Sequence, residues 1–172
     1  MEFNSLLAIV ISVLIVTVGV YLCVQALTRA LTERKQWEHR LVRQQVITPL
    51  RLQAYERMCL FLERVSPNNL IVRVAGSATT ASEFHQLLLR EIREEFNHNL
   101  AQQIYIGPDT WEIIRNAKEE VVTIINLAAQ EVPGEAPTGE LARRIIKLVI
   151  EKETLAVSTA LDTLKREIQA IF

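Results

Sequence analysis

The chain has 172 residues, of which 49% are hydrophobic and 23% are charged, and its 19 basic and 20 acidic side chains give a net charge of −1. This length excludes a polytopic transporter, the balanced charge argues against nucleic acid as a main partner, and two cysteines exclude a disulfide framework. The apolar residues are unevenly spread, because 18 of the 22 residues from Leu6 to Leu27 are apolar and none is charged. We therefore expect an apolar N-terminal segment joined to one domain-sized polar remainder.

The apolar segment predicts a transmembrane helix. Twenty-two helical residues extend about 33 Å, which matches the roughly 30 Å of hydrocarbon in a bilayer. The segment has no basic start and no small-residue cleavage site, so we interpret it as an uncleaved anchor in the lipid bilayer. Basic residues follow it from Arg29 onward, and the positive-inside rule then predicts an outer N-terminus and a cytoplasmic C-terminal domain at a bacterial inner membrane.

Small residues recur every seven positions in this segment, at Ser5, Ser12, Gly19 and Ala26. On a helix this spacing places them along one stripe, where a second helix can approach closely. We expect the stripe to pack on another transmembrane helix, from a second copy of the chain or from another membrane protein. Chance is the alternative, because small residues are common in membrane helices.

Residues 29–48 continue the apolar segment as a charged juxtamembrane helix. A thin apolar seam runs along it, formed by Leu31, Trp37, Leu41 and Val42. Thr48 suits an N-cap and Pro49 suits the first helical position, so a new helix or a kink is expected there. The predicted domains are a transmembrane anchor at 1–28, a juxtamembrane helical stalk at 29–48 and a cytoplasmic α-helical domain at 49–172.

Helical periodicity continues beyond residue 49. The segment 49–65 is apolar on most sides, which is typical of a buried helix, and only a narrow charged strip interrupts it. The segment 69–74 fits either a short helix or a strand, and with no second strand to pair with we favour a helix or an extended linker. Thr80 and Glu83 form a capping box, which predicts the start of an amphipathic helix over 81–104.

Two further helices complete the predicted domain. Asp109 and Glu112 predict a helix start by the same capping logic. The last helix is expected to run from near Thr138 toward Phe172, and its final turns follow a heptad pattern. The predicted fold is therefore all-α: an N-terminal transmembrane helix, a juxtamembrane helical stalk and a bundle-like cytoplasmic helical domain.

Charge is divided along the chain. Residues 29–64 hold eight basic and four acidic side chains, a net of +4, whereas residues 82–135 hold four basic and ten acidic side chains, a net of −6. This division predicts a basic stalk and an acidic surface on the middle helices, which would suit a basic partner. Solvated helix faces without a partner are the alternative.

Motifs for chemistry are scarce. The sequence has no glycine-rich phosphate loop and no metalloprotease or CxxC motif, and both Cys23 and Cys59 lie in apolar surroundings. The nearest approach to a metal motif is an E-x-x-H formed by Glu95 and His98, with Glu91 one turn earlier. Helical geometry places His98 nearly opposite the apolar face, so we expect no catalytic residue, metal site or cofactor. A candidate surface patch is formed by Glu91, Glu94, Glu95 and His98.

Several segments carry a resemblance to a known family. They are residues 51–58 (RLQAYERM), 62–67 (LERVSP), 89–99 (LREIREEFNHN) and 116–120 (NAKEE), together with Trp111. The chain resembles a family of uncharacterised single-pass membrane proteins from Bacteroidota over nearly its whole length. The resemblance implies a bacterial membrane protein, with no assigned activity and no catalytic residues to transfer.

The leading hypothesis is a membrane-anchored helical adaptor or accessory subunit of an inner-membrane assembly, without catalysis of its own. One alternative is a metal-dependent enzyme that uses Glu91, Glu95 and His98. Another is a tether or sensor that binds a soluble protein through the acidic helical surface. Nucleic acid is not expected as a partner in any of the three.

Overall fold

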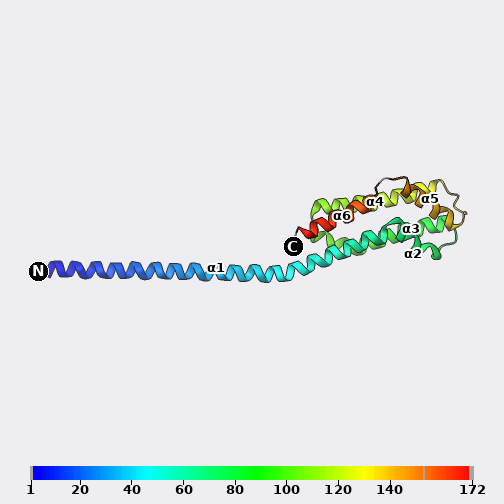
Figure 1. Ribbon diagram of the computed structural model, residues 1–172. Helices are drawn as coiled ribbons and strands as arrows, with labels where there is room; N and C mark the ends of the chain where they lie inside the picture. The colour runs from blue at the N-terminus through cyan, green and yellow to red at the C-terminus, as the bar shows by residue number, and fades with distance from the viewer. Residues whose placement is uncertain (1, 153, 171–172) are drawn as a thin grey trace. The chain divides into compact units, whose positions relative to one another are not determined.

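The computed structural model describes the backbone of residues 2–152 and 154–170, and the side chains of Leu14, 17–29, 45–152 and 154–170 (Figure 1). Within these ranges the regular elements are helical, and a bridge between Thr80 and Pro137 is the one extended pairing. The α-helices are α1 (Glu2–Val65), α2 (Pro67–Val74), α3 (Ala81–Asn99), α4 (Pro108–Gln130), α5 (Thr138–Ile150) and α6 (Ala156–Gln169). Two 3-10 helices follow α2 and α3, namely η1 (Ala75–Ser77) and η2 (Leu100–Ile104). The all-helical prediction is confirmed.

The chain forms two compact units, Met1–Thr48 and Pro49–Phe172, and α1 contributes to both. Pro49 lies inside α1, so no new helix begins at the Thr48-Pro49 pair. A proline inside a helix removes one backbone hydrogen bond, which α1 tolerates here. The two units divide between Thr48 and Pro49, which is also where we placed the boundary between the stalk and the helical domain.

The structure contradicts the membrane prediction made for the first unit. A bilayer span needs about 20 consecutive apolar helical residues. Within the described part of the chain no helix is long and apolar enough to cross a membrane. The predicted N-terminal transmembrane helix, its single-pass topology and the inner-membrane location are therefore wrong.

The small-residue stripe is only partly visible. Gly19 and Ala26 are exposed, and a Cβ added at Gly19 would meet no atom within 4 Å. Ser5 and Ser12 lie outside the residues with described side chains, as does the apolar seam of the stalk. The role of the stripe in helix packing stays a prediction.

The second unit has one hydrophobic core, in which α4 packs against α3, α5 and α6. Helix α1 places Tyr55, Met58 and Phe61 in this core, each no more than 2% exposed. The amphipathic helix predicted over 81–104 buries Phe84, Leu88 and Ile92, but α3 ends at Asn99 and gives way to η2. Residues 69–74 are helical, as favoured, and form most of α2.

The predicted start of α3 is confirmed. The Glu83 amide donates to Thr80 Oγ1 at 3.3 Å, and Glu83 Oε2 accepts from the Thr80 amide at 3.4 Å. The same carboxylate accepts from the amide and hydroxyl of Thr79 at 3.0 and 2.9 Å. These bonds favour the charged form and lower the pKa of Glu83 below its ordinary value of 4.5.

The predicted start of α4 at Asp109 is wrong. The N-cap is Gly107 and Pro108 occupies the first helical position, while no side chain caps the helix. Proline is favoured there because its missing amide has no partner in the first turn and its φ angle already suits a helix. Asp109 instead lies in the first turn, where its negative charge interacts favourably with the positive end of the helix dipole.

The single C-terminal helix predicted from Thr138 onward is also wrong, because α5 ends at Ile150 and α6 begins at Ala156. No glycine or proline marks this break. A carboxylate from another helix supports it: Glu120 on α4 accepts from the Ala156 amide at 2.6 Å and pairs with Lys152. Glu120 thus supplies the cap that the local sequence of α6 lacks.

Candidate functional site

The second unit carries a furrow that lies between the last turns of α1 and the C-terminal half of α3 and continues as a hollow over α3 alone. It consists of two adjoining cavities of about 320 and 300 Å³, which share Glu95 and His98. From α1 the first cavity is lined by Arg57, Leu60, Phe61 and Arg64, and from α3 by Glu95, His98 and Asn99. The second is lined by Glu91, Glu94, Glu95 and His98. We call this feature the α1/α3 furrow.

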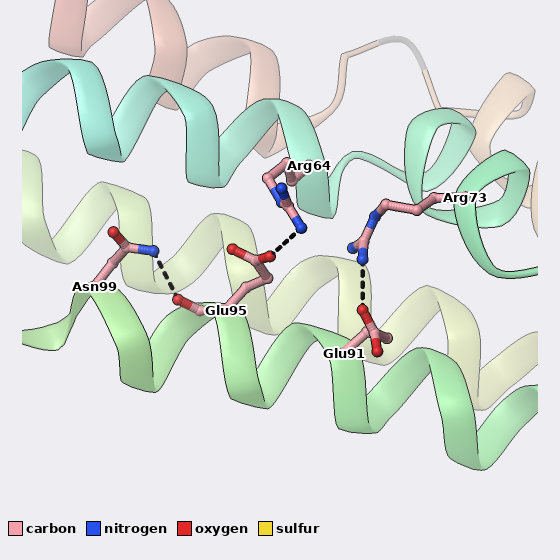
Figure 2. A network of polar contacts seen from close by, with 5 residues as sticks. All are labelled: Arg64, Arg73, Glu91, Glu95 and Asn99. Atoms are coloured by element: carbon pink, nitrogen blue, oxygen red, sulfur yellow. Dashed lines mark hydrogen bonds and ion pairs between the residues drawn. The ribbon is translucent and has the colours of Figure 1, made fainter.

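Two ion pairs join carboxylates of the furrow to arginines on other helices, as Figure 2 shows. Arg64 Nη2 on α1 lies 2.5 Å from Glu95 Oε1, and Arg73 Nη1 on α2 lies 2.5 Å from Glu91 Oε2. Glu91 and Glu95 share one face of α3 because residues four apart on a helix are neighbours. The first pair joins α1 to α3, and the second joins α2 to α3 one turn away.

Aromatic side chains support the floor of the furrow. The Phe61 ring is 1% exposed and lies 5.8 Å from the Phe96 ring, measured between centroids. Phe96 stacks on Trp111 of α4 at 5.7 Å, and the Lys118 ammonium lies 4.4 Å from the Phe96 centroid. The Phe61 side chain, which lines the first cavity, is thereby packed against α3, which in turn contacts α4 through Phe96.

Two α1 side chains of the furrow are left open to solvent. Leu60 is 58% exposed, directly next to the buried Phe61. Arg57 is exposed and forms no ion pair with any residue that the structure describes. The furrow therefore offers an apolar side chain and an uncompensated positive charge on the same wall.

The structure brings the four residues of the predicted surface patch to the second cavity. Glu91 and Glu95 are committed to arginines, and Glu94 lies 4.0 Å from Arg90. Among the described residues no group of three or more His, Cys, Asp and Glu side chains is arranged to hold a metal ion. Arg57, Leu60 and Arg64 were missed as site residues, although the charged strip on 49–65 was a signal for the two arginines.

Ion pairs also cancel much of the predicted acidic surface. Four carboxylates of 82–135 pair with basic residues from outside that segment: Glu91 with Arg73, Glu95 with Arg64, Glu120 with Lys152 and Glu131 with Arg144. Much of the uneven charge along the sequence is therefore explained by ion pairs within the chain. The net of −6 overstates the negative charge that this surface presents to a partner.

A second polar cluster centres on Glu167 of α6, half-buried between α1 and the start of α4. Its Oε1 accepts from the Tyr55 hydroxyl at 2.7 Å and from the Gly107 amide at 2.9 Å. Burial alone raises the pKa of Glu167, but hydrogen bonds from Thr110, Tyr55 and Gly107, with the charge of Arg51, lower it below 4.5. Burial and the nearby Glu167 raise the pKa of Tyr55 above 10.0. We interpret this cluster as a structural staple.

Comparison with known proteins gives one match. The model of a family described as a family of unknown function (DUF7935) matches residues 1–171. No curated protein and no solved structure matches the chain.

Proposed function

The chain belongs to the DUF7935 family of unknown function, and for it we propose the role of a non-catalytic adaptor that binds a partner protein through the α1/α3 furrow. The observation that carries this proposal is the exposure of Leu60 beside the buried Phe61. Burying a leucine side chain contributes about 1.5–3 kcal/mol, so Leu60 is a strong anchor for a contact. The resemblance to Bacteroidota proteins supports a bacterial host.

The chemistry of the furrow supports contact rather than catalysis. Arg64 and Arg73 hold Glu95 and Glu91 at 2.5 Å. Each of these two carboxylates is therefore already paired with an arginine of the same chain. The same pairs fix the spacing of α1, α2 and α3, so the furrow is formed before a partner arrives, which lowers the entropic cost of binding.

Affinity purification of the full chain from its native host tests this proposal. Leu60→Asp places a charge in the furrow, whereas Val72→Asp is the matched control, because Val72 is 83% exposed and does not line the furrow. We expect at least one co-purifying protein to fall by about tenfold or more with Leu60→Asp and to be retained with Val72→Asp. Recovery of the same proteins with both variants would contradict the adaptor role of the furrow.

A further inference from the structure

We propose that the partner segment in the α1/α3 furrow is an amphipathic helix that places an apolar side chain on Leu60 and a carboxylate on Arg57. This inference rests on the proposed function and names the chemistry of its partner. It depends on the shape of the furrow and on its charge.

The shape of the furrow suits a helix. Its first cavity extends along α1 from Arg57 to Arg64, seven residues or about 10 Å, and its second continues along α3 to Glu91. In the first cavity the groove lies between two packed helices, whose ridges accept the side chains of a third helix. The two cavities overlap at Glu95 and His98, so about two turns of a partner helix would fill their combined length.

The charge of the furrow selects a carboxylate. In the first cavity Arg64 and Glu95 neutralise each other, whereas Arg57 has no ion pair in the described part of the chain. Arg57 and Leu60 are three residues apart and share a face of α1, so a partner that covers Leu60 also removes water from Arg57. Desolvating an arginine without an opposite charge is costly, whereas a carboxylate provides a bidentate partner.

This geometry also fixes the spacing of the partner residues. Leu60 and Arg57 are separated by about 4.5 Å along the α1 axis. On a partner helix the carboxylate therefore lies three or four residues from the apolar side chain that meets Leu60. An acidic residue directly adjacent to that apolar side chain would point to another face.

Photo-cross-linking in the native host tests the inference with the full chain. A benzophenone amino acid replaces Leu60 or, as the control outside the furrow, Val72, and mass spectrometry locates the cross-linked residue. We expect position 60 to cross-link to a helical segment with Asp or Glu three or four residues away. Arg57→Glu should reduce this cross-link by about tenfold, Arg57→Lys should keep most of it, and reversing the partner acid to arginine should restore it with Arg57→Glu.

The outcomes separate this inference from the proposed function. A position 60 that cross-links no more than position 72 would overturn both. A cross-link that Arg57→Glu leaves unchanged, or one to a segment without an acidic residue at that spacing, would overturn only the chemistry of the partner. A cross-link to a second copy of this chain would overturn the partner helix and identify the furrow as a self-association surface.

Discussion

The Tyr55 hydroxyl donates to Glu167 Oε1 at 2.7 Å and thereby joins two residues that lie 112 positions apart in the sequence. The same oxygen accepts from the Gly107 amide at 2.9 Å, so one carboxylate connects α1, the start of α4 and α6. The contact joins the first and the last helix of the second unit. Because Tyr55 and Phe61 lie on the same helix, it also helps to hold the wall of the α1/α3 furrow in place.

Tyr55→Phe should lower the free energy of unfolding by about 1–3 kcal/mol. The substitution keeps the buried ring and removes one donor from a charged acceptor, which is the stronger class of hydrogen bond. Chemical denaturation followed by circular dichroism measures the loss. Tyr105→Phe is the matched control, because the Tyr105 hydroxyl forms no hydrogen bond in the described residues, and a similar loss in both variants would contradict the staple.

The staple should also make stability depend on pH. The pKa of Glu167 is lowered below 4.5 in the folded chain, where burial opposes the change and hydrogen bonds outweigh it. The unfolded chain therefore binds this proton at higher pH, and the stabilisation is present above about pH 4.5 and lost as the pH falls through the folded pKa. The difference in unfolding free energy between wild type and Glu167→Gln should shrink from about pH 6 to pH 3. A difference that stays constant would contradict this origin.

Gly107→Ala should destabilise the chain although Gly107 has no left-handed backbone conformation. A Cβ at this position would lie 2.7 Å from Glu167 Oε1, so this oxygen must move away from the Tyr55 hydroxyl and the Gly107 amide that donate to it. We expect a loss of about 1–2 kcal/mol, measured by denaturation. Gly76→Ala is the control, because an added Cβ meets nothing within 4 Å there, and equal losses at the two glycines would contradict the steric explanation.

Glu120→Gln should loosen the start of α6. The variant keeps the size of the side chain but removes the negative charge that faces Lys152 and the Ala156 amide. A charged cap contributes about 1–2 kcal/mol, so the first amides of α6 should exchange hydrogen faster. Glu119→Gln is the control, because Glu119 is 59% exposed and pairs with its neighbour Lys118. Unchanged exchange at the start of α6 would show that Glu120 does not cap it.

Local patterns predicted much of the helical fold. The Thr80 capping box and the apolar spacing of α3 gave the correct start and the correct buried face, because both depend on residues within a few turns. The break between α5 and α6 escaped prediction because its cap comes from Glu120, 36 residues away from Ala156. The apolar run near the N-terminus predicted a membrane span that no helix of the described chain provides.

The candidate site was predicted only in part. The spacing of Glu91, Glu95 and His98 placed them together in a predicted surface patch, and in the structure they line one cavity. Their partners could not be predicted, because Arg64 and Arg73 reach them through tertiary packing. The periodicity of one helix predicts on which side of that helix a residue lies. It does not predict which other helix packs against that side.

Labelling of a cysteine at position 60 tests most directly whether the furrow is a contact surface. Leu60→Cys and Val72→Cys are made in a full chain whose Cys23 and Cys59 are replaced by alanine, and each is treated with a membrane-permeant maleimide in native host cells and after purification. We expect position 60 to be labelled about tenfold more slowly in cells than in the purified chain, with no such difference at position 72. Equal labelling of position 60 in both conditions would contradict the account.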